Sequence, residues 1–270
     1  MTKENICISD LLLLSESLET KIESLKKIGA TYVELLVDGK AWDDTASCYE
    51  KYTPYLLESG LKFSIHPPAW DTNLTSENKS IREATYNEYC RAVEFAYAIG
   101  GEHVVIHPGF CYSPGFDKKL AQQRARELVS RLCAVAKPLG ITLAIENVGY
   151  NGSSLFTQEE YVAFVKELDS SAAYLIDTGH AHLNGWDIPA LIRDTRDRLC
   201  SIHLHDNFAD GDRHLPIYEG NIDWEPIFAE LRKAQLCLPI LEYAPGTEFS
   251  KLEKSLKLLQ EQLNEGAQAG

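Results

Sequence analysis

The chain has 270 residues, of which 44% are hydrophobic and 24% are charged, and its formal net charge is −14. This length and composition suit one globular α/β barrel of about 250 residues, with disorder expected only in the tail, residues 264–270. The acidic balance disfavours nucleic acid as a partner, because the surface as a whole repels polyanions.

Short runs rich in β-branched residues recur along the chain and predict eight strands. They cover residues 5–9, 32–37, 62–66, 103–107, 142–146, 172–177, 199–203 and 238–242. Segments with helical spacing lie between them, such as residues 17–29 and 89–100. Several of these segments end at a glycine, as expected when the residue that caps the helix C-terminus adopts a left-handed backbone conformation. These glycines are Gly29, Gly60, Gly100 and Gly140.

Eight strand–helix units with no break in composition predict an α/β fold, a single (β/α)8 or TIM barrel over residues 1–270. A doubly wound open sheet is the alternative. Such a sheet would normally be shorter or carry a glycine fingerprint after its first strand, and residues 8–16 contain no glycine.

Residue types that bind metals occupy the last position of six successive predicted strands, from the third to the eighth. They are His66, His107, Glu146, Asp177, His203 and Glu242. In a barrel these strand ends meet at one face, where catalysis takes place in this fold. A single histidine there is more often a hydrogen-bonded structural residue, but six such residues indicate a site. Since no lysine or arginine is adjacent to them, a divalent metal is the simplest counter-charge.

Residues 203–214, HLHDNFADGDRH, contain three histidines and three aspartates. Imidazoles and carboxylates are the usual ligands of Zn²⁺, Mn²⁺ and Fe²⁺, and they are also the usual general bases. The segment alone does not choose between these uses.

Six motifs follow one another in an order and spacing typical of one family. They are VVIHPG, LAIENV, LIDTGHAH, HLHDN, DRHLPIYEGNIDW and LEYAPG. Over most of its length the chain thereby resembles the xylose-isomerase-like TIM barrels, which include sugar isomerases and epimerases, inosose-processing enzymes and apurinic endonucleases.

The resemblance implies one divalent cation with four protein ligands, namely Glu146, Asp177, His203 and Glu242. It also implies that Glu146 and Glu242 are the catalytic residues that transfer protons. Further positions match substrate-binding residues, and these are His180, Arg213, His66 and His107. Some epimerases of the family have another glutamate shortly after Glu146, and its absence from residues 146–152 argues against the ketose 3-epimerase subtype.

The endonuclease branch of the family carries three zinc ions, and residues matching all of its ligands are present. They form the sets His66, His107 and Glu146; Asp177, His203 and Glu242; and His180, Asp212 and His214. Additional metals are therefore expected at His66, His107, His180, Asp212 and His214. The acidic charge and short loops argue against DNA binding.

We therefore expect a metal-dependent isomerase or epimerase of a small sugar, sugar phosphate or inosose, acting through an enediolate. The expected cofactor is Mn²⁺ or Zn²⁺, with Co²⁺ or Fe²⁺ as alternatives and room for more than one metal per chain. A multinuclear zinc phosphoesterase is the main alternative, and a non-catalytic metal-dependent binding protein is the third. No membrane-spanning run or signal peptide is recognisable, so we expect a cytoplasmic protein, compatible with a homo-oligomer.

Other side chains near the predicted strand ends have milder expected roles. Aromatic residues are expected to form the apolar walls of the pocket, namely Trp70, Phe110, Tyr112 and Trp186. Tyr218 is expected to cover the substrate. His205 lies on the same strand face as His203 but matches no family role, so we expect it to form a hydrogen bond.

Overall fold

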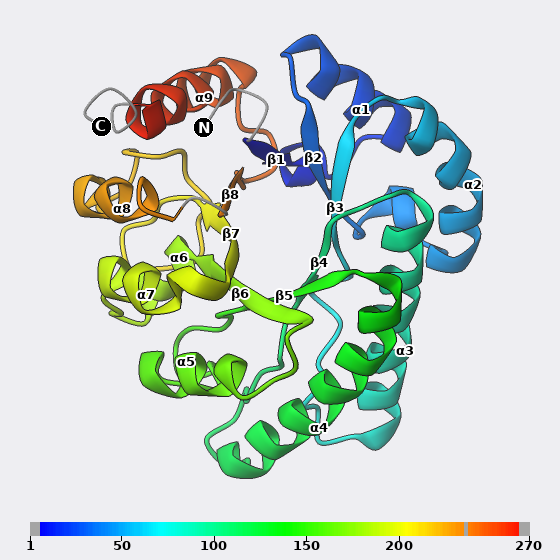
Figure 1. Ribbon diagram of the computed structural model, residues 1–270, viewed down its shortest axis with the longest axis vertical. Helices are drawn as coiled ribbons and strands as arrows, with labels where there is room; N and C mark the ends of the chain where they lie inside the picture. The colour runs from blue at the N-terminus through cyan, green and yellow to red at the C-terminus, as the bar shows by residue number, and fades with distance from the viewer. Residues whose placement is uncertain (1–5, 235–236, 265–270) are drawn as a thin grey trace.

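The computed structural model describes residues 6–234 and 237–264, which form a closed barrel of parallel strands (Figure 1). The strands pair in chain order, and the last pairs with the first. They are β1 (Cys7–Ser9), β2 (Tyr32–Leu36), β3 (Lys62–His66), β4 (His103–Ile106), β5 (Thr142–Glu146), β6 (Ala172–Asp177), β7 (Leu199–Leu204) and β8 (Leu238–Leu241). The predicted (β/α)8 barrel is confirmed, and the doubly wound sheet was the wrong alternative.

The observed strand ends differ slightly from the predicted ones. β4 and β8 end one residue early, so His107 and Glu242 are the first residues after their strands. β7 continues one residue past His203. Such shifts arise because backbone pairing ends where the chain begins to turn into a loop. Residue 5, where the first predicted strand starts, and residues 265–270 of the predicted disordered tail lie outside the described residues.

Helices connect the strands and surround the barrel (Figure 1). They are α1 (Leu18–Lys27), α2 (Thr45–Glu58), α3 (Lys79–Ala98), α4 (Lys118–Ala136), α5 (Gln158–Lys166), α6 (Thr178–Leu183), α7 (Ile188–Thr195), α8 (Trp224–Leu231) and α9 (Phe249–Asn264). The four glycines predicted as C-caps all adopt left-handed backbone angles, with φ between 69° and 81°. Among the described helices, none combines the length and apolar character needed to cross a membrane.

The main apolar core lies between the sheet and the helices. Leu18, Ile22 and Leu25 of α1 are buried in it, as their spacing predicts, while Ile28 packs against it and is only partly buried. This layer holds the helices against the outside of the barrel, and it leaves the strand ends free to carry polar side chains.

The inside of the barrel is partly polar. Glu34 on β2 lies within 4 Å of His203 on β7 and of His103 on β4, contacts that can only be made across the barrel interior. The Ser64 hydroxyl on β3 donates a hydrogen bond to the Glu34 carboxylate. All four residues are buried. The interior therefore presents a layer of ionisable side chains directly beneath the strand ends.

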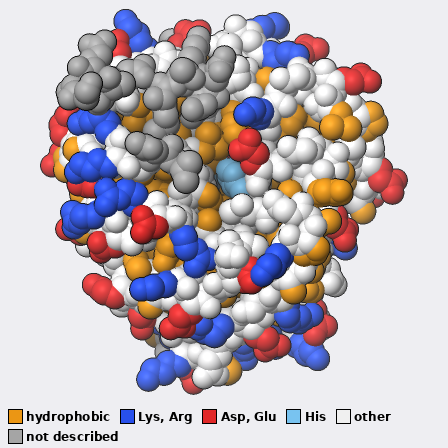
Figure 2. Space-filling model, viewed as in Figure 1, with side chains coloured by type: hydrophobic (Ala, Val, Ile, Leu, Met, Phe, Trp, Pro, Cys, Tyr) orange, Lys and Arg blue, Asp and Glu red, His pale blue; other side chains and the backbone are white. Residues whose placement is uncertain are grey.

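Charged side chains are spread around the outside of the molecule. On the face shown in Figure 2, Lys and Arg are interspersed with Asp and Glu around the edge, and hydrophobic side chains lie nearer the centre. The acidic excess of the chain is therefore not concentrated in one patch on this face.

Candidate functional site

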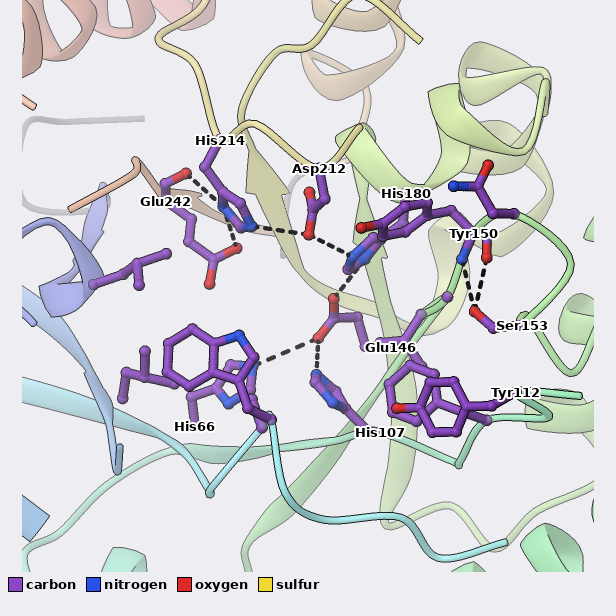
Figure 3. Close-up of a pocket in the computed structure, with 18 residues that line it drawn as sticks. His66, His107, Tyr112, Glu146, Tyr150, Ser153, His180, Asp212, His214 and Glu242 are labelled. Carbon is purple, nitrogen blue, oxygen red and sulfur yellow. Dashed lines mark hydrogen bonds and ion pairs between the residues drawn. The ribbon is translucent and has the colours of Figure 1, made fainter. Parts of the chain in front are cut away.

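The predicted metal-binding residues meet at the carboxyl ends of β3 to β8 (Figure 3). Helix α6 adds His180, and the loop after β7 adds Asp212 and His214. Together with apolar side chains they border a cavity of about 500 Å³. Asp177 and His203 are fully buried and do not themselves line the cavity. The strand order of the barrel thus brings together residues that are far apart in the sequence.

His203 lies close to the other three residues expected to bind a single cation. His203 Nδ1 lies 3.2 Å from Glu242 Oε2, 3.7 Å from Asp177 Oδ2 and 3.9 Å from Glu146 Oε1. Atoms bound to one cation at about 2.0–2.2 Å are at most about 4.4 Å apart. The three distances from His203 meet this limit, as expected of ligands to a single cation.

Glu146 also connects this group to a second one. Its Oε2 atom lies 3.0 Å from His107 Nε2 and 3.7 Å from His66 Nε2, and its Oε1 atom lies 3.1 Å from His180 Nδ1. One atom each of His66, His107 and Glu146 fall close enough together to ligate a further ion. The carboxylate is thus placed to bridge two cations.

The third predicted set is centred on Asp212. Its Oδ2 atom lies 3.3 Å from His180 Nε2 and 3.2 Å from His214 Nε2. His205 also belongs to this region, because its Nε2 atom lies 2.9 Å from Asp177 Oδ2 and its ring stacks on that of His214 at 3.9 Å. His205, His214 and Glu242 form another group with metal-ligand spacing. His205 therefore makes the kind of contact expected for it and is also close enough to act as a ligand.

Several buried polar atoms of this cluster have no hydrogen-bond partner among the described residues. They are both ring nitrogens of His203, Nδ1 of His107, Nδ1 of His205 and Oδ1 of Asp212. An unpaired buried polar atom is costly, and metal coordination is one way to satisfy it. Nitrogen and oxygen donors together suit Zn²⁺, Mn²⁺, Co²⁺ or Fe²⁺. The donor set therefore fits a divalent transition metal.

The charged groups of the cluster shift one another's pKa values where a cation would bind. Burial favours a raised pKa for Glu242, but His203 and His214 outweigh it and lower this pKa to about 2. Burial favours a lowered pKa for His214, but its hydrogen bond to Asp212 and the nearby carboxylate charges raise it to about 9. Glu242 is therefore ionised at neutral pH and His214 supplies counter-charge, whereas burial lowers the pKa of His107. A divalent cation would displace such protons.

Two local features hold the ligands in place. The side chain of Asn147 donates to the carbonyl of Asp177 and accepts from the Asp177 N–H at 2.7 Å, which fixes the end of β6. At Gly179, a Cβ atom would lie 2.0 Å from Cε1 of His205. Only glycine therefore allows the first turn of α6 to pack against the His205 ring.

The loop carrying Asp212 and His214 is anchored by a buried aspartate. The Asp206 carboxylate accepts hydrogen bonds from the backbone N–H groups of Tyr218 and Ile222 and from Nε1 of Trp224. Of the three aspartates in residues 203–214, Asp206 thus organises the loop, while Asp212 faces the cavity. The third, Asp210, pairs with Arg213 on the surface.

Three residues expected at the pocket do not line it. Arg213 is 53% exposed, and two hydrogen bonds tie its guanidinium to Asp210. Tyr218 donates to Glu225 instead of covering the cavity. Trp186 packs against the core beside Tyr161. In contrast, Trp70, Phe110 and Tyr112 all line the cavity, as expected.

Sequence reasoning overlooked Glu34. Its Oε1 atom lies 3.0 Å from Nε2 of His203, and Glu34, His203 and Glu242 together have metal-ligand spacing. A charged residue inside an otherwise apolar strand, YVELLV, was the available signal. Attention to strand ends alone missed it.

Comparison with known proteins gives matches over almost the whole chain. The family model described as "Xylose isomerase-like TIM barrel" matches residues 22–262. The uncharacterized protein MJ1311 of Methanocaldococcus jannaschii is 27% identical over 84% of this chain and 78% of its own length. A probable endonuclease 4 of Haloarcula marismortui is 27% identical over 67% of this chain and 68% of its own.

Two solved structures share the fold at low sequence identity. A D-tagatose 3-epimerase-like protein superposes with a TM-score of 0.84 and 22% identity, covering 98% of both chains. The IOLI protein with a bound zinc atom superposes with a TM-score of 0.78 and 16% identity, covering 97% of both chains. These similarities establish the barrel architecture over the full length of each pair.

Proposed function

The chain belongs to the xylose isomerase-like TIM barrel family, and on that premise we propose that it is a divalent-metal-dependent isomerase or epimerase of a small sugar. The observation that carries the proposal is the arrangement around His203 Nδ1, with carboxylates of Glu146, Asp177 and Glu242 within 3.9 Å. The fold is shared with a D-tagatose 3-epimerase-like protein and with the zinc-bound IOLI protein. The first similarity favours sugar chemistry, and the second favours a metal site.

Glu146, Asp177, His203 and Glu242 would hold the cation. Zinc and manganese are the metals that we favour, because the ligand set mixes nitrogen and oxygen donors. When bound, the cation would polarise the carbonyl of the substrate and stabilise the negative charge that develops on its oxygen.

The protein side chains would move the proton. Glu146 and Glu242 come from different strands and approach the cavity from different sides (Figure 3). Both carboxylates have lowered pKa values because, although burial opposes it, neighbouring imidazoles favour the ionised form. One ionised carboxylate would remove the proton next to the carbonyl. That group would return the proton to the neighbouring carbon of the enediolate, or the other carboxylate would first take a proton from solvent and then deliver it. His66, His107 and His180 border the cavity and would bind substrate hydroxyls.

Proton exchange with solvent tests this proposal. The protein is incubated in D₂O with a panel of ketoses, aldoses and inososes, and its metal content is measured by elemental analysis. We expect at least one divalent metal per chain and deuterium at the carbon next to the carbonyl of the true substrate, seen by NMR. A metal-free protein whose activity is indifferent to chelators would contradict the proposal.

A phosphoesterase with several metals is the second candidate. It is favoured by the metal-ligand spacing of His66, His107 and Glu146, beside further groups of such residues, and by the similarity to a probable endonuclease 4. In such an enzyme His66 and His107 would hold a metal that positions the attacking hydroxide, and displacement at phosphorus needs both metals.

The double variant His66→Ala, His107→Ala distinguishes the two candidates. For the isomerase, all four ligands of the essential metal remain, so one metal and part of the turnover should persist. For the phosphoesterase, loss of one metal should abolish phosphate release. Circular dichroism checks the fold of the same sample. A folded, inactive variant that has lost one metal of several would favour hydrolysis. Residence in the cytoplasm and assembly as a homo-oligomer remain predictions alongside this function.

A further inference from the structure

We propose that the natural substrate is an uncharged sugar that carries a second ring, such as a disaccharide or another glycoside, and is not a sugar phosphate. This inference rests on the proposed function and names the substrate class of the same site. The reacting sugar would lie against the carboxylate and histidine cluster, and the second ring would lie on aromatic side chains at the mouth of the cavity.

The charge of the cavity argues against an anionic substrate. Three carboxylates line it, those of Glu146, Asp212 and Glu242, and no Lys or Arg does so within residues 6–234 and 237–264. Arg213, the one cation expected there, is tied to Asp210 outside the lining. Proteins usually bind phosphate through arginine, lysine or a helix N-terminus. A phosphate group would thus find no Lys or Arg, and the histidines of the lining are already paired with Glu146 or Asp212.

Exposed aromatic residues at the mouth indicate what the cavity binds instead. Tyr112 is 63% exposed and Trp70 is 57% exposed, although both line the cavity. Tyr112 stacks on Phe110 with ring centroids 5.2 Å apart and planes inclined by 15°. We call Trp70, Phe110 and Tyr112 the aromatic shelf. Its apolar area would be covered by the C–H face of a sugar ring or by an aromatic aglycone.

Phe110, at the centre of the shelf, is held in place by the loop between β3 and α3. The N–H of Phe110 donates to Oδ1 of Asn73 at 3.0 Å, and the Thr75 hydroxyl donates to the Phe110 carbonyl at 2.8 Å. Gly109, with φ of 128°, packs so closely that a Cβ atom would lie 2.4 Å from Thr75 Oγ1. Such a prearranged surface binds a ring without having to order itself first.

The shelf adjoins the metal-binding side chains. The Phe110 ring meets His107 edge to face at 5.8 Å, and His107 contacts Glu146. A ligand that reaches from Glu146 to Tyr112 would therefore extend across the cavity from its ionisable floor to its apolar mouth. One small sugar at the floor would leave the outer shelf uncovered.

Three sugars that differ only at one oxygen test the inference. They are D-fructose, D-fructose 6-phosphate, and isomaltulose, in which O6 of fructose carries a neutral hexose ring. Their dissociation constants for the full-length, zinc-loaded protein are measured by calorimetry. We expect isomaltulose to bind at least about tenfold more tightly than fructose, and the phosphate at least about tenfold more weakly.

Variants of the shelf give a second measurement. Tyr112→Ala and Trp70→Ala should each reduce the preference for isomaltulose over fructose by about threefold to tenfold, and Tyr112→Phe should retain it. Tyr97→Ala is the matched control, because Tyr97 on α3 is 60% exposed and does not line the cavity. Since these side chains are exposed, thermal unfolding should be little changed.

The outcomes separate the two proposals. If the phosphate binds as tightly as isomaltulose, the substrate class is wrong. Equal affinity for all three sugars, lack of measurable binding included, also overturns it. If isomaltulose is preferred and the preference depends on the shelf, but no sugar in the D₂O panel exchanges a proton, the inference about binding stands and the proposed isomerase chemistry fails.

Discussion

The imidazole of His203 lies between carboxylates on both sides. Its Nδ1 atom faces Glu146, Asp177 and Glu242, while Oε1 of Glu34 lies 3.0 Å from its Nε2 atom. A carboxylate on the far nitrogen of a metal-binding histidine fixes the tautomer and orientation of the ring and makes it a better donor. Glu34 is therefore placed to position His203 without touching the substrate.

Replacing Glu34 by glutamine should weaken metal binding by about 10- to 100-fold. The isosteric amide keeps the volume of the side chain but loses the charge behind His203. Competition with a coloured chelator measures the affinity, and the absorption spectrum of the Co²⁺ form reports the ligand geometry. Glu102→Gln is the control, because the Glu102 side chain is exposed and forms an ion pair with Lys62. An unchanged zinc affinity in Glu34→Gln would show that His203 is oriented by packing alone.

The residues at strand ends were predictable, and Glu34 was overlooked, for one physical reason. A polar residue that ends an apolar strand of a barrel must face the mouth, so Glu146 and Asp177 could be placed from the sequence. Whether a charged residue in mid-strand faces the interior or the helices depends on the tilt and register of the barrel. Glu34 could only be flagged as unusual, and its partner across the interior could not be named.

At the scale of elements, the loop between β7 and α8 depends on one carboxylate. Asp206 binds Tyr218, Ile222 and Trp224, and Gly220 lies so near that a Cβ atom there would be 2.2 Å from Asp206 Oδ1. These contacts join the beginning of the loop to its end, and Asp212 and His214 lie between the two. None of these contacts of Asp206 involves a predicted metal ligand.

Asp206→Ala should lower the free energy of unfolding by at least about 3 kcal/mol, because it leaves several buried N–H groups without an acceptor. It should also release the loop, so that amide hydrogens of residues 207–223 exchange faster with solvent. Urea unfolding and hydrogen exchange measure the two effects. Asp210→Ala, which only removes the surface pair with Arg213, should change the stability by no more than about 1 kcal/mol. Equal stability of the two variants would contradict the anchoring role.

The elements themselves follow from local patterns, whereas the loop does not. Hydrophobic periodicity and glycine C-caps locate strands and helices because both are set by neighbouring residues. The course of the loop depends on a contact between Asp206 and Trp224, 18 residues apart. This is why Arg213 and Tyr218 were expected at the cavity and lie outside it.

At the scale of the molecule, the closed barrel buries many ionisable groups in one place. Glu146, Asp177, His203 and Glu242 are all buried, and both nitrogens of His203 lack hydrogen bonds. A cation that binds only the folded chain stabilises it in proportion to the logarithm of its concentration. Metal binding should therefore be visible in the stability of the whole protein.

Zinc at about 1,000 times its dissociation constant should stabilise the fold by about 4 kcal/mol, which corresponds to a rise in melting temperature of roughly 7 °C. Differential scanning fluorimetry with zinc and with excess chelator measures the shift. The rise should be absent in His203→Ala, which lacks the central ligand. A rise of the same size in that variant would place the stabilising ion elsewhere.

Because the strands pair in chain order, the ligands of the site are synthesised one after another and meet only when the barrel closes. His66 leaves the ribosome long before Glu242, and the ligands surround a common point only once β8 has joined both β7 and β1. A cation that is present earlier would meet only separate histidine and cysteine side chains of an incompletely folded chain. Interactions that form after the folding transition state act mainly on the rate of unfolding. Bound metal should therefore change the rate of folding little and should slow the unfolding of the finished protein strongly.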